Sequence, residues 1–159
     1  MKALTLTQPW ATAVAIGAKR IETRSWSTSY RGPLAIHAAK GFPGWAKRFS
    51  CEWLIKREMK RGSPALAFTA GLAAQMLPTG VVLATCHLAD CIPTTRVGEI
   101  SEEERELGDY APGRFAWVLR DIVRLPEPIA AKGALGLWQW DFPGIGVHPC
   151  SSVVTKAQA

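Results

Sequence analysis

The chain has 159 residues, of which 48% are hydrophobic and 20% charged, with a formal net charge of +6. This length suits one domain with a sizeable core, and the composition argues against a disordered chain. No run approaches the roughly 18 apolar residues of a transmembrane helix. Strand-like sequence directly follows Met1-Lys2, where a signal peptide would stand. We therefore expect a cytoplasmic protein.

Charge is unevenly distributed along the chain. Six of the thirteen acidic residues lie between Glu99 and Asp109, where Arg105 is the only cation. Between Lys19 and Arg61, eleven basic and three acidic residues give +8, and tryptophans are interleaved with them. Cations neutralise phosphates and aromatic rings stack on bases, so this pattern favours a nucleic acid or nucleotide partner. The alternative is an ordinary cationic surface.

The first elements are predicted to be a strand, a helix and a charged strand. Residues 3–7 read as a short strand, and Pro9 suits the first position of a helix that runs to about Ile16. Gly17 can end this helix with a positive φ. The following residues alternate with the period of a strand, which directs one set of side chains to a single face: Arg20, Glu22, Arg24 and Trp26.

The segment that contains Lys19, Glu22 and Arg24 is the leading candidate for a functional site. A strand points Glu22 and Arg24 the same way, and Lys19 lies at its start. These groups can hold an anion or the edge of a nucleobase. The alternative is a solvated strand face with cross-strand ion pairs. If the cluster is a binding site, we expect Lys19→Ala or Arg24→Ala to abolish ligand binding and to leave the fold largely intact.

A second strand and two helices follow. The strand over 34–37 is expected to pair antiparallel with the charged strand, and it ends at His37, with Lys40 nearby. The helix over 44–61 carries Trp45, Phe49 and Trp53 along one face, which predicts a core seam. Its six cations could lie beside a nucleic-acid path. A helix over 64–76 completes a helical insertion at about 44–77.

The second half supplies the remaining strands. Residues 80–88 are almost all apolar, as in a strand buried on both faces. Ser101 and Glu104 form a capping box for a short acidic helix that ends near Gly108. Residues 113–119 and 122–125 read as two more strands. We expect a single α+β domain over 1–150 with about five to seven strands, most simply a small barrel, and a loose tail over 151–159.

Four cysteines at positions 51, 86, 91 and 150 are expected to be buried thiols rather than a disulfide framework. Cys86 and Cys91, with His87 and Asp90 between them, are residue types that bind zinc, but residues five apart in a strand face opposite sides of the sheet. We therefore expect no metal and no cofactor.

Four short motifs, which occur along the chain in the order that the family shows, resemble the ASCH domain family. The segment Gly17-x-Lys19-x-x-Glu22-x-Arg24 is similar to the family signature G-x-K-x-x-E-x-R. The other three are an opening, a middle and a closing motif: Leu6-x-Gln8-Pro9-Trp10; Gly113-Arg114-Phe115-Ala116-Trp117; and Pro128-Ile129, Lys132-Gly133 and Leu137-Trp138. The resemblance covers most of residues 3–140 outside the helical insertion. It implies a PUA-like fold, a small β-barrel with peripheral helices and a cleft beside the signature.

The resemblance also implies a function, the binding of RNA, other single-stranded nucleic acid or a modified nucleoside. Lys19, Glu22 and Arg24 would line the cleft, which is expected to be cationic. To these the strand geometry adds further candidates for stacking or hydrogen bonding to the ligand: Trp26, Tyr30, His37 and Lys40.

Some ASCH proteins are small hydrolases, so the resemblance leaves an enzyme open. One group deacylates N-acetylated cytidine with a lysine that activates a threonine in G-x-K-x-x-T-x-R, and a glutamate donates the proton. Here Glu22 stands where that threonine would be, and Thr23 is expected to face the other way. Glu22 would instead act as general base toward a water, with Lys19 beside it and Glu106 as the nearest match to the proton donor.

Two further alternatives remain. Another family member has been described as a ribonuclease; for that chemistry Lys19 or Arg24 would stabilise the phosphorane, and His37 or Glu22 would move protons. A protein-interaction adaptor would make contact through the acidic helix over 99–109. It ranks last, since an adaptor has no need of the charged cluster.

Overall fold

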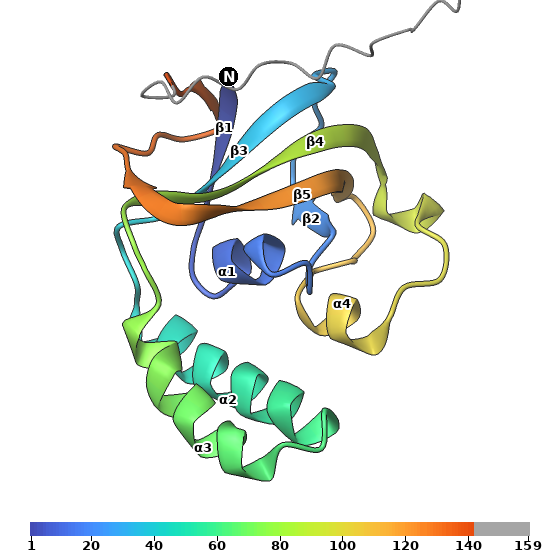
Figure 1. Cartoon of the computed structure of the whole chain (residues 1–159). Helices are drawn as coiled ribbons and strands as arrows, with labels where there is room; N and C mark the ends of the chain where they lie inside the picture. Colours follow the sequence, from blue (N-terminus) through green and yellow to red (C-terminus); the bar gives the residue numbers. More distant parts are fainter. Residues whose placement is uncertain (142–159) are drawn as a thin grey trace, which may run out of the picture.

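Six strands form one curled sheet at the centre of this computed structural model, which describes residues 1–141 apart from the side chains at positions 64, 65 and 68 (Figure 1). The sheet order is β2-β5-β4-β3-β1-β6. The pair β1–β3 is parallel and the other neighbours are antiparallel. The strands are β1 (Lys2–Leu6), β2 (Ile21–Arg24), β3 (Gly32–Ala38), β4 (Val81–Pro93), β5 (Phe115–Ala130) and β6 (Leu137–Gln139).

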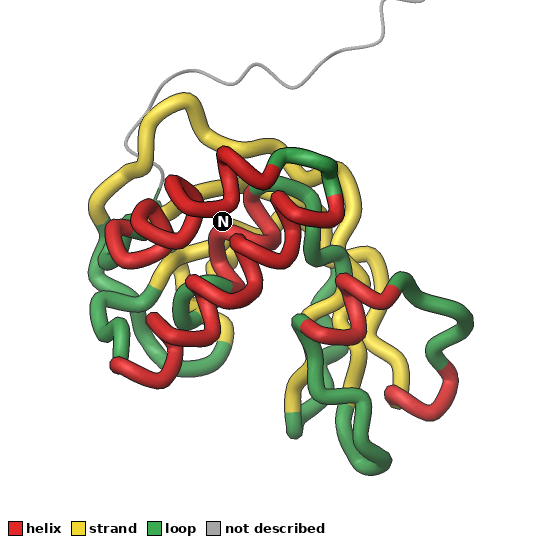
Figure 2. Tube along the Cα trace, turned by 90° about the horizontal axis from the view of Figure 1, so that it is seen from below, coloured by secondary structure: helices red, strands yellow, loops and turns green. Residues whose placement is uncertain are grey.

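The helices gather on one side of the sheet (Figures 1 and 2). They are α1 (Trp10–Ala15), α2 (Gly44–Lys60), α3 (Pro64–Ala73) and α4 (Glu102–Glu106), with short 3₁₀ turns at Ala74–Met76 and Thr94–Arg96. The helix α1 lies between the sheet and the antiparallel pair α2–α3 (Figure 1). None of the helices within the described residues combines the length and apolar character needed to cross a membrane.

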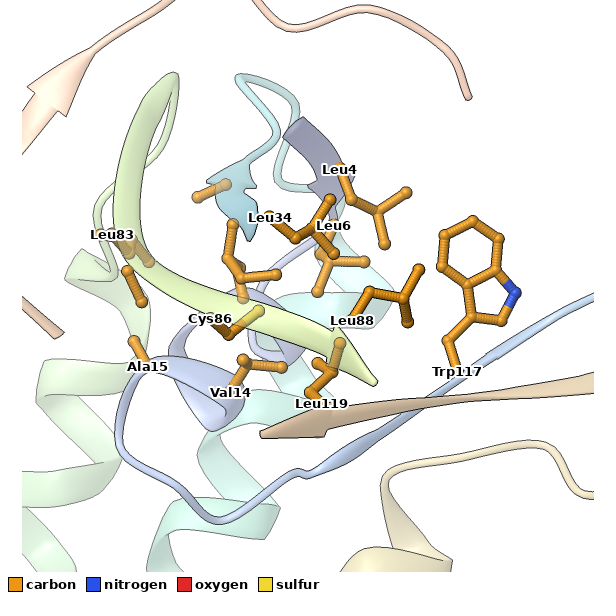
Figure 3. Packing of buried hydrophobic residues seen from close by; sticks show 14 residues of the cluster. Leu4, Leu6, Val14, Ala15, Leu34, Leu83, Cys86, Leu88, Trp117 and Leu119 are labelled. Atoms are coloured by element: carbon orange, nitrogen blue, oxygen red, sulfur yellow. The ribbon is translucent and has the colours of Figure 1, made fainter. Parts of the chain in front are cut away.

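Two clusters of apolar side chains hold these layers together. The larger one joins the sheet to α1 and includes Leu4, Val14, Leu88 and the fully buried Trp117 (Figure 3). The smaller one joins Ala13 of α1, Trp53 of α2 and Leu107 after α4. The second cluster therefore fixes α2 and α4 relative to α1 and to the turn that follows it, where the candidate site lies.

The predicted α+β class and strand number are confirmed. The six strands form one curled sheet, in which β2 and β6 are the two ends. The helices predicted at 44–61 and 64–76 correspond to α2, α3 and the 3₁₀ turn that follows. The insertion remains a prediction, and the boundary at 150 and the tail at 151–159 lie outside the described residues.

The predicted arrangement of the strands was wrong in two places, the pairing of one strand and the extent of another. The strand β3 pairs with β1 and β4, while β2 pairs with β5. The burial of Leu34, Ala35 and Ile36 explains this difference, because such a strand belongs in the middle of a sheet. The strands predicted at 113–119 and 122–125 are one strand, β5. Asp121, with φ of 51°, lies where its register with β4 shifts, and this bulge keeps the chain in the sheet.

The cysteines match the prediction in part. Cys86 is buried, which raises the pKa of its thiol to about 12, whereas Cys51 and Cys91 are half-buried; all three are free. Cys150 lies outside the described residues. Within residues 1–141 no group of three or more metal-ligating side chains is placed to hold an ion.

Candidate ligand-binding site

The turn between α1 and β2 buries Lys19. Gly17 ends the helix with φ of 74°, as predicted, and the N–H of Lys19 donates to Ala13 O at 3.0 Å. The Lys19 side chain is completely buried, and its Nζ donates to Ile21 O at 2.5 Å and to Leu107 O at 2.8 Å. These bonds join β2 to the end of α4.

Two carboxylates lie beside the buried ammonium group. Lys19 Nζ is 3.5 Å from Glu22 Oε2 and 3.9 Å from Glu104 Oε1. Burial lowers the pKa of Lys19, and the two carboxylates oppose this shift. A buried cation needs such partners, since desolvation of an isolated charge is costly.

Glu104 attaches α4 to the beginning of β2. Ser101 Oγ caps α4 by accepting the N–H of Glu104, as the capping-box pattern predicted. The Glu104 side chain points to the strand instead of back to the cap, and it accepts the N–H groups of Arg20 (2.6 Å) and Ile21 (3.2 Å). This contact was missed by sequence reasoning, because the capping pattern predicts a local partner and the actual partner is about 80 residues away in the chain.

Glu22 is the centre of the charged cluster. One carboxylate oxygen faces Lys19, and the other lies 3.0 Å from Arg24 Nε. Arg24 Nη2 also donates to Thr5 O at 2.9 Å. The structure thus brings Lys19, Glu22 and Arg24 together as the strand pattern predicted, with Lys19 in the interior and Arg24 toward the surface.

A cavity of about 430 Å³ lies against this cluster. One wall is formed by Glu22, Thr23 and Arg24, and Thr5 to Thr7 form its neighbour. Lys19 is absent from the lining, since it lies behind Glu22. Thr23 belongs to the lining, although the sequence predicted that it faces away; its Oγ1 accepts the N–H of Asp109.

Aromatic rings form another part of the lining. Trp10 stacks on Phe49 with 5.3 Å between ring centroids and 7° between planes, and Trp45 lies 5.9 Å from Trp10. All three line the cavity, and Trp45 is 56% exposed. The predicted core seam is correct for Trp53 and in part for Phe49, which is partly buried and packs against the cluster of Ala13, Trp53 and Leu107. It is wrong for Trp45 in the first turn of α2, whose exposed ring lines the cavity.

The cavity carries mixed charge and is not the cationic cleft that the sequence predicted. Arg24 and Arg114 are matched by Glu22, Glu106 and Asp109. Glu106 forms an ion pair with Lys56 of α2. Such a lining presents both donors and acceptors.

The cations of α2 are largely taken up by α4. Arg57 pairs with Glu103 at 2.7 Å and Lys60 pairs with Glu102 at 2.8 Å, next to the pair made by Lys56. The acidic helix therefore pairs with three of the five cations of α2, while Lys47 and Arg48 form no ion pair among the described residues. It is less available as the contact surface of an adaptor, and α2 offers fewer cations to a nucleic acid.

Two candidates, Trp26 and Tyr30, lie outside the cavity. Trp26 packs edge-on against Trp117 at 4.6 Å, and Trp117 Nε1 donates to Trp26 O. Tyr30 Oη donates to Pro33 O at 2.6 Å. Both side chains make structural contacts.

His37 and Lys40 line a different cavity. His37 is 2% exposed, with Nε2 3.1 Å from Ala131 O and Nδ1 3.2 Å from Thr5 Oγ1. Burial lowers the pKa of His37, against a smaller opposite effect of the hydrogen bond to Ala131. The ribonuclease hypothesis loses support from this placement, because His37 and Glu22 do not line the same cavity.

Sequence reasoning missed Trp10, Trp45, Phe49 and Arg114 as site residues, and Asp109 as well. Trp10 and Arg114 belong to motifs that were recognised, Leu6-x-Gln8-Pro9-Trp10 and the segment from Gly113 to Trp117. These motifs could have identified them.

Comparisons with known proteins agree with the recognised motifs. Human activating signal cointegrator 1 is 24% identical over 140 residues, and the mouse protein of the same name is 25% identical over 138; each match covers 87% of this chain and 22% of the relative. The chain thus spans about a fifth of the length of these relatives. A crystal structure of a mutant ZmASCH protein from Zymomonas mobilis covers 81% of this chain and 74% of that chain at 16% identity, with a TM-score of 0.44. The ASCH domain model matches residues 4–127, and the chain therefore belongs to the ASCH domain family.

Proposed function

We propose that this ASCH domain binds single-stranded RNA by holding one base, plain or modified, in the cavity between α1, α2 and β2. The observation that carries the proposal is that one cavity of about 430 Å³ is lined both by aromatic rings and by polar side chains. A volume of this size suits a small ligand. Membership of the ASCH family is consistent with such a ligand.

The two groups of lining side chains supply the two interactions that base recognition needs. Trp10, Trp45 and Phe49 offer ring faces, and stacking on an aromatic side chain contributes roughly 1–3 kcal/mol per base. Glu22 offers an acceptor and Arg24 offers donors to the edge of a base in a single strand. The mixed charge of the lining favours a base over a phosphate in this cavity.

Lys19 acts on the ligand indirectly in this proposal. Its contacts with Glu22 and with two carbonyl groups hold the polar wall in place. The signature residues therefore divide into one internal support and two side chains that face the ligand, Glu22 and Arg24.

Trp45→Ala is expected to weaken RNA binding by about tenfold or more, since it removes a stacking surface. Its effect on stability should be small, because the ring is 56% exposed. Fluorescence anisotropy with a labelled single-stranded RNA octamer of mixed sequence measures the affinity. Met59→Ala is the matched control, as Met59 lies on the same helix, is 54% exposed and is not part of the lining. Equal affinities of the two variants would contradict the base site.

A second candidate function, an amidohydrolase that removes an acyl group from a nucleoside, is favoured by the presence of Glu22 and Glu106 in one cavity. Glu22 would accept a proton from a water whose oxygen attacks the acyl carbon, and the C–N bond then breaks. Glu106 would release Lys56, take up a proton and donate it to the departing amine. The products are the free acid and the nucleoside.

Glu22→Gln is expected to abolish any turnover of N-acylated nucleosides, because an amide cannot take the proton from water. Mass spectrometry of nucleosides incubated with the wild type and with this variant detects the loss of the acyl group. Glu103→Gln is the control, since Glu103 pairs with Arg57 and lies outside the cavity. A wild type that turns over none of the acylated nucleosides would leave the domain as a binding module, and turnover that survives in Glu22→Gln would exclude Glu22 as the base.

A further inference from the structure

A second cavity, of about 970 Å³, adjoins the first cavity, the proposed site of the base, at Thr5. Its walls come from the ends of β3 and β5, from the turn into β4 and from the loop over 131–135. Thr5 lines both cavities. Its carbonyl oxygen accepts from Arg24, and its hydroxyl oxygen lies 3.2 Å from His37 Nδ1. The two cavities thus have one lining residue, Thr5, in common.

The charge of the second cavity differs from that of the first. Lys40 and Lys132 are exposed side chains of its lining, and the lining holds no carboxylate. Neither lysine belongs to any ion pair formed within residues 1–141. Two uncompensated cations around one hollow create a positive potential that attracts an anion.

The floor of this cavity is fixed by a network around Thr5 and His37. Thr5 Oγ1 donates to Ala134 O and accepts the N–H of Trp138 Nε1 at 3.0 Å. Trp138 packs edge-on against the His37 ring, with 5.6 Å between centroids. Gly133 lies in close contact with this ring, since an added Cβ would be 2.4 Å from His37 Cε1. The loop that carries Lys132 is therefore held close to the sheet.

Small residues separate the two lysines. Ala39 and Gly80 adjoin Lys40 in the lining, and alanines and a glycine surround Lys132 at positions 130–134. Because these side chains are short, the hollow between the lysines has room for a group as large as a phosphodiester.

We propose that this second cavity binds a backbone phosphate of RNA, adjacent to the nucleotide whose base occupies the first cavity, with Lys40 and Lys132 as its cations. This inference rests on the proposed function. It implies that the ligand is an oligonucleotide, in which one nucleotide fills the base cavity and the neighbouring phosphate crosses Thr5. A free nucleoside would use the first cavity alone.

The test compares two ligands and three proteins. The ligands are an RNA octamer with ordinary phosphodiesters and the same sequence with uncharged methylphosphonate linkages. The proteins are the wild type, Lys40→Ala/Lys132→Ala, and the charge-matched control Arg96→Ala/Arg105→Ala, whose two exposed arginines line neither cavity. Thermal unfolding checks that all three are folded.

The lysine variant is expected to bind the phosphodiester octamer about tenfold more weakly than the wild type, and the arginine control less than about threefold more weakly. The slope of log affinity against log salt should fall by about 0.7 for each phosphate that the variant no longer neutralises. The wild type should prefer the charged octamer by a larger factor than the lysine variant does.

Equal decreases in affinity in the two double variants would overturn the phosphate site, because the lysines would then act only through net charge. Wild-type affinity in the lysine variant would overturn it as well. Failure of the proposed function looks different: the wild type would bind neither octamer, or Trp45→Ala would bind both as the wild type does.

Discussion

Replacing Lys19 with alanine is expected to lower the free energy of unfolding by about 3–5 kcal/mol, because the change leaves buried charge without its partner. The side chain is fully buried between the carboxylates of Glu22 and Glu104. The replacement also removes the donor of Ile21 O and Leu107 O. Urea denaturation of the wild type and the variant measures the difference. The charge pattern alone predicted an intact fold, and the burial of Lys19 changes that expectation.

Arg20→Ala is the matched control for this experiment. It removes one positive charge from the next residue, whose side chain is exposed, so its effect on stability should stay within about 0.5 kcal/mol. If Lys19→Ala were as stable as the wild type yet failed to bind RNA, Lys19 would have to contact the ligand directly, and its position behind Glu22 would be wrong.

Trp53→Ala is expected to lower the free energy of unfolding by about 3–5 kcal/mol, as is usual for a large aromatic residue in a core. The ring is 3% exposed and packs with Ala13 and Leu107, where α1, α2 and the end of α4 meet. The cavity left by alanine cannot collapse easily, because these three segments are also tied by hydrogen bonds and ion pairs. Thermal or chemical denaturation measures the decrease in stability.

Trp45→Ala provides the comparison within the same helix. Trp45 is 56% exposed, so its replacement should cost about 1 kcal/mol or less and act on ligand binding instead. The two tryptophans thus separate stability from recognition. A Trp53→Ala protein that stayed stable but bound RNA more weakly would place Trp53 on the binding surface and contradict its assignment to the core.

Local features of the site were predictable from the sequence. Gly17 has the positive φ that its place after a helix indicated, and Ser101 caps α4 as its spacing from Glu104 indicated. The alternation of the charged strand predicted that Glu22 and Arg24 lie together, and they do. Each of these features depends on residues a few positions apart, whose geometry the backbone largely determines.

The charge of the cleft was not predictable, because it depends on distant partners. The cations of α2 looked available to a nucleic acid, but Lys56, Arg57 and Lys60 pair with carboxylates of α4 more than 40 residues away in the chain. Only the docking of both helices against α1 reveals this compensation. The separation of His37 from Glu22 has a similar origin, since it follows from β3 lying in the middle of the sheet while β2 lies at its end.

Photocrosslinking of the wild-type protein to a single-stranded RNA octamer, followed by mass spectrometry of the crosslinked peptides, tests the central claim most directly. Stacking places a base against the aromatic wall, so the account predicts crosslinks at Trp10, Trp45 or Phe49. Crosslinks confined to peptides without these rings, such as those from the outer part of β5 that carry Arg120 and Arg124, would contradict a base in this cavity.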